Sequence, residues 1–83
     1  MAVETASVGR IVHYVSYGTP GGEFSQECRA AIVTEVDHST GSVGLCVLNP
    51  TGQFFHPIAR NGGCPYDGSD QPQGGSWHWP ERV

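Results

Sequence analysis

Turn-forming residues divide this chain into pieces too short for a stable helix. Twelve glycines and six prolines are spread over 83 residues, and the runs between them are short and apolar. The longest candidate for a helix, Gln26–Val36, contains Ile32, Val33 and Thr34. Three consecutive β-branched residues favour a strand over a helix. The sequence therefore predicts an all-β fold.

Five segments have the short apolar pattern, bounded by Gly, Pro, Asn or Asp, that is typical of strands. The strands are expected at Gly9–Tyr17, Arg29–Val36, Ser42–Leu48, Gln53–Ile58 and Ser76–Trp79.

Two of the links between these segments have clear turn chemistry. Asp37–Gly41 is expected to form a hairpin loop in which Gly41 adopts the left-handed conformation. In Asn49–Gly52 the proline at the second position favours a type I turn. Gly52 is then expected at positive φ, in the bulge position that begins the next strand.

The whole chain, residues 1–83, is expected to be one small domain. Residues 1–8 are an N-terminal arm, and residues 59–75 are a long loop rich in Gly and Pro that is too polar to pack. Closing the sheet removes the exposed edges of short strands, so we expect a small five-stranded SH3-like barrel. An OB-like barrel is the alternative, but it usually has a helix where this chain has only Asn49–Gly52.

Charge and apolar patterning exclude several classes of partner. Eight acidic residues face four arginines, with no lysine, and this net charge of −4 argues against binding duplex nucleic acid. No apolar run approaches the roughly 18–20 residues of a membrane span. The first six residues lack the basic cluster and apolar core of a signal peptide, and three cysteines are an odd number. A cytoplasmic protein with reduced thiols is expected.

Four segments carry a resemblance to known proteins. They are Gly9–Glu23 (GRIVHYVSYGTPGGE), Cys28–Val36 (CRAAIVTEV), Val47–Phe55 (VLNPTGQFF) and Gly74–Glu81 (GGSWHWPE). Together they resemble small uncharacterised proteins of actinobacteria and their bacteriophages, over nearly the whole chain. The chain departs from that pattern at His56, where those proteins have Asn. The resemblance implies a phage accessory gene expressed in a bacterial host cytoplasm, and it brings no activity or site residue with it.

Metal and cofactor sites are not expected from the spacing of the candidate ligands. The chain has three cysteines and four histidines, and the smallest separation of a Cys from a His is eight residues, as for Cys64 and His56. Structural zinc sites usually contain pairs of ligands two to four residues apart. The sequence therefore predicts no metal site and no cofactor.

Enzyme chemistry is also not expected. Cys28 precedes Arg29, and an adjacent cation favours the nucleophilic thiolate, with His13 on the neighbouring strand as the candidate base. The common motifs of hydrolases, phosphate-binding loops and zinc proteases are absent. Glu35 and Asp37 are more typical of a solvated surface than of a pair of catalytic carboxylates. The protein is predicted not to be an enzyme.

Aromatic residues are the most informative feature for function. Adjacent or alternating rings such as Phe54 and Phe55 point to opposite faces, so some of the rings must lie outside the interior. Trp77 and Trp79 share a face, and one of them is expected in the core while Arg10 or Arg29 stacks on the other. Exposed aromatic rings are typical of binding surfaces. The alternative is that the loops Gly18–Glu27 and Ala59–Gly75 cover these rings. The residues expected to bind a ligand or partner are Tyr14, Tyr17, Arg29, Phe55, His78 and Trp79.

The sequence thus predicts a non-enzymatic binding or accessory protein of phage type. It is expected to engage a protein partner or a small polar ligand, with nucleotides among the candidates, and to antagonise a host system. One alternative is a structural virion component, such as a capsid decoration or cement protein, which uses an exposed apolar face as an interface. Another is a small Cys/His metal-binding protein. A homo-oligomer is compatible with each of these functions.

Overall fold

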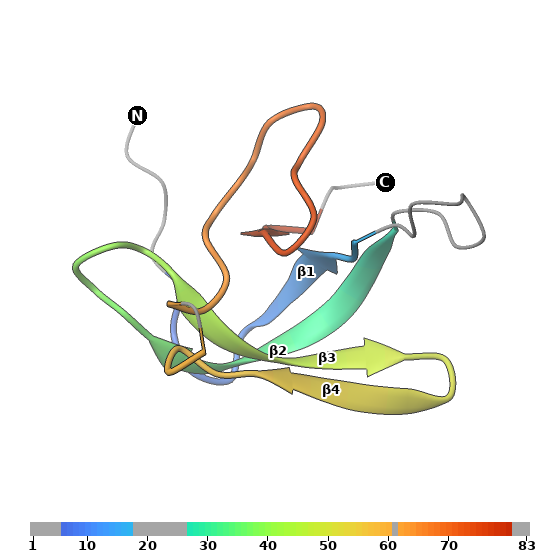
Figure 1. Ribbon diagram of the computed structural model, residues 1–83, viewed down its shortest axis with the longest axis horizontal. Coiled ribbons are helices and arrows are strands. Elements are labelled where there is room, and N and C mark those ends of the chain that lie inside the picture. The colour runs from blue at the N-terminus through green and yellow to red at the C-terminus, as the bar shows by residue number, and fades with distance from the viewer. Residues whose placement is uncertain (1–5, 18–26, 61, 81–83) are drawn as a thin grey trace.

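The computed structural model describes residues 6–17, 27–60 and 62–80, and within these ranges it contains five strands and no helix (Figure 1). The all-β prediction is confirmed, and the described part of the chain has no helix that could cross a membrane. The expected loop Gly18–Glu27 and arm 1–8 lie mostly outside the described residues. The strands are β1 Ile11–Val15, β2 Cys28–Val36, β3 Val43–Asn49, β4 Gly52–His56 and β5 Trp77–His78.

The strands form one open antiparallel sheet in the order β4-β3-β2-β1-β5. β2, β3 and β4 are neighbours both in the chain and in the sheet, whereas β5 returns to pair with the other edge of β1. This last pairing joins His13 to His78 and Tyr14 to Trp77. The C-terminal strand therefore lies beside the first strand, and β4 forms the opposite edge of the sheet (Figure 1).

The two faces of the sheet differ in composition. The inner face carries the core, which includes Val12, Tyr14, Ala31, Val47 and Trp77. Side chains of successive strand residues point to opposite faces, so the residues between these positions form the outer face. The outer face carries His13, Ile32, Cys28, Phe55 and His78.

Trp77 is the core anchor that the sequence predicts for the last strand. Its side chain is almost fully buried, and its ring makes edge contacts with Tyr66 and Trp79, at centroid distances of 5.0 and 5.4 Å. The indole Nε1 donates a hydrogen bond to the Gly41 carbonyl oxygen at 3.3 Å. Trp79 is only partly buried, and the Arg10 guanidinium lies 4.6 Å from its ring centroid. The predicted division between the two tryptophans is confirmed, and Arg10 is the stacking arginine.

β5 is shorter than the expected strand Ser76–Trp79. The amide of Ser76 donates to the carbonyl oxygen of Gln73 in a turn, at 3.2 Å, and is not part of the ladder. Pro80 has no amide hydrogen to extend the strand at the other end. The ladder is therefore limited to two residues.

The segment 59–75 is not the unpacked polar loop that its composition suggests. Cys64 is buried in the core, and its backbone exchanges two hydrogen bonds with Val43, of 2.8 and 3.0 Å. Two residues later, Tyr66 forms a parallel bridge with Trp77. The expectation is wrong here because two apolar residues, well separated from the other apolar runs, are enough to fix an otherwise polar segment.

The structure contains both predicted turns, but only one of the two predicted left-handed glycines. Gly41 ends the Asp37–Gly41 loop at φ 79°, and its amide donates to the Asp37 carbonyl oxygen. Gly52 is not in the left-handed region, so the expectation of positive φ is wrong. Asn49 and Gly52 already face each other across the ladder, and the connection needs only Pro50 and Thr51. Gly52 is consequently an ordinary strand residue.

These two glycines give a matched test of backbone strain. Neither would bring an added Cβ within 4 Å of another group, so an alanine at either position differs mainly in φ. We expect Gly41→Ala to lower the free energy of unfolding by about 1 kcal/mol or more, because an L-residue is strained in the left-handed region. Gly52→Ala should leave stability unchanged or raise it slightly. Urea denaturation followed by tryptophan fluorescence measures both, and equal effects would contradict the turn assignment.

Candidate functional site

The structure divides the six predicted binding residues among different places. Tyr14 and Tyr17 line one pocket, whereas His78 and Trp79 line another. Phe55 is exposed on the outer face at the sheet edge. Arg29 pairs with Glu27, its guanidinium nitrogen lying 2.8 Å from the carboxylate. These residues therefore do not form one continuous surface, and the two pockets are separate candidate sites.

The first candidate is a small pocket of about 230 Å³, which we call the tyrosine pocket. Tyr14 reaches it from β1, and its ring stacks on His56 at the end of β4, with centroids 4.9 Å apart. Tyr14 is expected from the sequence on an exposed aromatic surface, but its ring is buried and belongs to the core. Tyr17, by contrast, is 70% exposed. The lining residues are Tyr14, Tyr17, His56, Arg60, Gly63, Cys64 and Gly75.

A close backbone approach positions Tyr17 in this pocket. Gly75 has φ 86°, and its amide donates to the Val15 carbonyl oxygen at 2.7 Å. A Cβ added at Gly75 would overlap the Tyr17 hydroxyl group. The positive φ favours glycine here, and a side chain at this position would displace the exposed Tyr17 ring. The pocket therefore depends on the path of the segment that precedes β5.

In the tyrosine pocket, one charged residue, Arg60, is surrounded by side chains that are neutral at pH 7 and can form hydrogen bonds. Burial, with smaller contributions from Cys64 and Tyr17, raises the pKa of Tyr14 to about 12. Burial also raises the pKa of the Cys64 thiol to about 11. The pKa of His56 is lowered, first by burial and then by the nearby charge of Arg60. At neutral pH, Arg60 thus carries the formal charge among the described lining residues.

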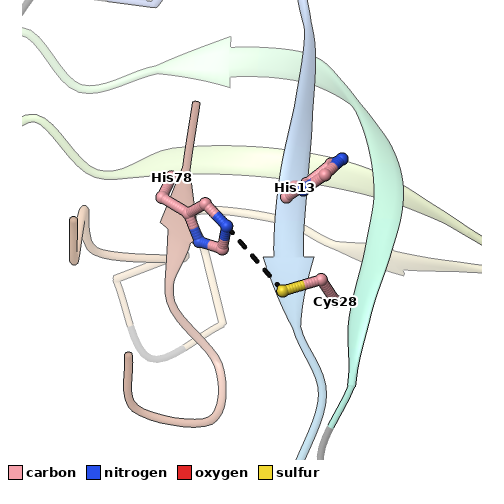
Figure 2. A group of neighbouring side chains, drawn as sticks. All are labelled: His13, Cys28 and His78. Atoms are coloured by element: carbon pink, nitrogen blue, oxygen red, sulfur yellow. Dashed lines mark hydrogen bonds between the residues drawn. The ribbon is translucent and has the colours of Figure 1, made fainter. Parts of the chain in front are cut away.

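The second candidate is a cluster of His13, Cys28 and His78, which we call the His/Cys cluster. Figure 2 shows the three neighbouring side chains, from β1, β2 and β5, with a ring nitrogen of His78 directed at the Cys28 sulfur. The Cys28 Sγ atom lies 3.7 Å from His78 Nε2. The two imidazole rings meet edge to face with centroids 5.5 Å apart, and one ligand atom from each of the three residues lies within 4.8 Å of the others.

The strand register explains why these residues meet. His13 and His78 are direct partners across the β1–β5 ladder. Cys28 pairs with Val15, two residues beyond His13 on the same strand and therefore on the same face. From the sequence, Cys28 and His13 are considered together only as a possible nucleophile and its base. The structure places these two residues close together and adds His78 as a third member.

The His/Cys cluster opens into a pocket of about 500 Å³. His78 is only 5% exposed, whereas Cys28 at the start of β2 is exposed, so the cluster is reached from the side of the cysteine. Asp67 lies nearby: hydrogen bonds from Ser69 and Gln73 lower the pKa of its carboxyl group, and His78 adds an electrostatic contribution. The pocket is lined by Cys28, Tyr66, Gly68, Ser69, Asp70, Pro72, His78 and Trp79.

No protein-family model, curated protein or solved structure matches the chain. The resemblance to actinobacterial and phage proteins therefore stays a prediction. The functional argument rests on the geometry of the two pockets.

The lowered pKa of His56 predicts a pH dependence of stability. An unfolded histidine titrates near 6.5, and the folded state holds His56 neutral to lower pH. Between those two pKa values the unfolded chain binds more protons, so stability falls as the pH falls through and below 6.5. We expect this loss to be smaller in His56→Gln, as measured by melting temperature against pH.

His38→Gln is the control, because His38 is exposed on the β2–β3 loop and does not line the pocket. This variant should keep the slope of the wild-type protein. Identical slopes for the wild-type protein and His56→Gln would contradict the burial of neutral His56.

Proposed function

We propose that the chain is a non-enzymatic binding protein that takes a small phosphorylated ligand of the nucleotide class in the tyrosine pocket. One observation carries this proposal. Arg60 is the charged group among the described lining residues, and it stands beside the potential donors of Tyr14, Tyr17 and His56. No carboxylate is among those lining residues, so the pocket favours an anion.

The donors suit a phosphate group. An arginine guanidinium offers a planar fork that matches two phosphate oxygens. The raised pKa of Tyr14 keeps its hydroxyl group protonated and able to donate over the physiological range. The lowered pKa of His56 leaves its ring neutral at pH 7, with one N–H to donate. A phosphate can thus be bound without a second cation in the pocket.

The size of the pocket determines how a nucleotide would bind. About 230 Å³ is less than the roughly 300–1,000 Å³ of typical ligand pockets, so only the phosphate end would enter. The exposed ring of Tyr17 lies at the same pocket and offers a stacking surface for the base outside it. The ligand would be anchored by its phosphate and held more weakly by its base.

The closure of the sheet and the cellular compartment of the protein are part of the same proposal. We infer that the sheet curls into a small SH3-like barrel, because the segment with Cys64 and Tyr66 makes a backbone bridge to β3 at one end and to β5 at the other. The three cysteines are thiols, which is consistent with a reducing compartment such as a bacterial cytoplasm. A phage accessory protein that sequesters a host nucleotide is consistent with both inferences.

The ligand proposal is tested by calorimetric titration with inorganic phosphate, nucleoside monophosphates and the corresponding nucleosides. We expect binding of phosphate and tighter binding of a nucleotide, with no binding of nucleosides. Arg60→Gln should weaken binding about tenfold or more, because a charged hydrogen bond contributes roughly 1.5–3 kcal/mol. Tyr17→Leu should remove the additional affinity that the base gives a nucleotide over phosphate, whereas Tyr17→Phe should keep most of that additional affinity.

Arg29→Gln is the matched control, because Arg29 does not line the tyrosine pocket. Its affinity should equal that of the wild-type protein. Equal weakening by Arg29→Gln and Arg60→Gln would indicate a general charge effect and contradict the proposal, as would the absence of phosphate binding.

The outer face favours a second candidate function, self-association or docking in a virion. One row of directly paired apolar residues crosses four strands, and Phe55 at its end is 63% exposed on the edge strand β4. Unpaired strand edges and exposed apolar rows are typical of interfaces between chains. The row consists of Ile11, Ile32, Cys46 and Phe55, of which Ile11 and Phe55 are exposed, Ile32 is half-buried and Cys46 is buried.

Phe54 and Phe55 provide a matched pair for this second candidate. They are 62% and 63% exposed but lie on opposite faces, because Phe54 pairs with Val47 and Phe55 with Cys46. We expect light scattering to show a dimer that dissociates in Phe55→Glu and persists in Phe54→Glu. A monomer at all concentrations, or equal effects of the two variants, would contradict association through the outer face.

A further inference from the structure

We propose that His13, Cys28 and His78 bind one divalent transition-metal ion, with Zn²⁺ as the natural occupant. The proposal reverses the expectation from the sequence, which found no closely spaced pair of ligands. It is independent of the tyrosine pocket, since it uses residues of the outer face whereas Tyr14 lies on the inner face. Its failure would leave the phosphate proposal untouched.

The identity of the donors fits zinc. Imidazole nitrogen and thiolate sulfur are the ligands that structural and catalytic zinc sites use most often. The His/Cys cluster offers two of the first and one of the second. Three protein ligands with an open fourth position are typical of zinc sites that also bind water or another small ligand.

The separation of the donors fits a shared ion. Zinc–sulfur and zinc–nitrogen bonds of roughly 2.3 and 2.0–2.1 Å at a tetrahedral angle place the sulfur and nitrogen about 3.6 Å apart. The observed distance from Cys28 Sγ to His78 Nε2 is 3.7 Å. The remaining donor separations are at most 4.8 Å and would need to shorten by up to about 1.5 Å, which requires a side-chain rotation of His13.

The backbone already holds the three ligands in register. β5 pairs with β1 at His13 and His78, and β2 pairs with β1 at Val15 and Cys28. The Cα positions are therefore fixed by two ladders before any ion binds. Little ordering entropy remains to be lost on binding, which favours affinity.

The surroundings accept a positive charge and provide a way in. One thiolate and two neutral imidazoles leave a bound Zn²⁺ with a net charge of +1. Asp70 lines the same pocket as Cys28 and His78, and none of the described lining residues is an arginine. Cys28 is exposed, so an ion enters from solvent, and the pocket of about 500 Å³ leaves room for water at the fourth position.

Binding is a simple exchange of ligands without a redox step. The Cys28 thiol loses its proton to solvent as the Zn–S bond forms, and the two imidazoles bind through nitrogen lone pairs. Affinity should therefore rise with pH. The ion would also join β5, which has only two residues, to β1 and β2, so the folded state should be stabilised by the metal.

The test is a titration of the metal-free full chain with Co²⁺ and then Zn²⁺, in a phosphine reductant that keeps the thiols reduced. Co²⁺ reports on the donors directly, because a thiolate ligand gives a near-ultraviolet charge-transfer band. We expect one Co²⁺ per chain with that band, full displacement by one equivalent of Zn²⁺, and a higher melting temperature with Zn²⁺.

Variants identify the ligands. Cys28→Ser should abolish the thiolate band although Cys46 and Cys64 remain, and His13→Gln should weaken Zn²⁺ binding by about tenfold or more. His78→Gln should have the same effect, with folding checked by circular dichroism because His78 is buried. If that variant does not fold, Cys28→Ser and His13→Gln decide the outcome. His38→Gln, an exposed histidine away from the cluster, is the control and should bind as the wild-type protein does.

Three results would overturn the proposal. The first is the absence of a saturable band in the wild-type protein. The second is a band that persists in Cys28→Ser, which would assign the thiolate to another cysteine. The third is equal weakening by His13→Gln and His38→Gln, which would indicate non-specific binding to histidines.

Discussion

The pairing of β5 with β1 is the interaction on which both candidate sites depend. The ladder has two residue pairs and is extended by two backbone hydrogen bonds that join Val15 to Gly75 and Ser76. Such bonds, with a net value of about 1 kcal/mol each, contribute only part of the stability that so short a strand needs. The buried indole of Trp77 provides the missing stabilisation, through its contacts with Tyr66 and Trp79 and its hydrogen bond to Gly41. A hydrophobic contact on the inner face thus fixes the position of His78 on the outer face.

β1 contributes to both candidate sites for the same reason. Tyr14 points to the inner face and lines the tyrosine pocket, while its neighbour His13 points to the outer face and joins the His/Cys cluster. The partner strand repeats this alternation, since Trp77 faces Tyr14 and His78 faces His13. Two sites with different chemistry can therefore occupy a domain of 83 residues, because the sheet separates them.

Local patterns predict the features that depend on local physics. The β-branched run of β2, the left-handed Gly41 and the burial of Trp77 all follow from neighbouring residues and from alternation. The His/Cys cluster does not, because Cys28 and His78 are 50 residues apart and meet only through the β1–β2 and β1–β5 registers. The positive φ predicted for Gly52 is wrong because the backbone conformation of Gly52 depends on its pairing with Asn49 in the β3–β4 ladder. The residue types of the turn do not determine where that ladder ends.

The three cysteines show how burial assigns different roles to one residue type. Cys64 is buried in the core, which raises the pKa of its thiol to about 11, so it remains protonated and poorly suited to bind a metal. The Cys46 thiol is also buried and donates a hydrogen bond to the Gln53 side-chain oxygen at 3.2 Å. Cys28 is exposed and lies beside a histidine nitrogen. Of the three cysteines, Cys28 alone has both an accessible thiol and a neighbouring imidazole. This combination, and not the number of cysteines, carries the proposal of a metal site on the outer face.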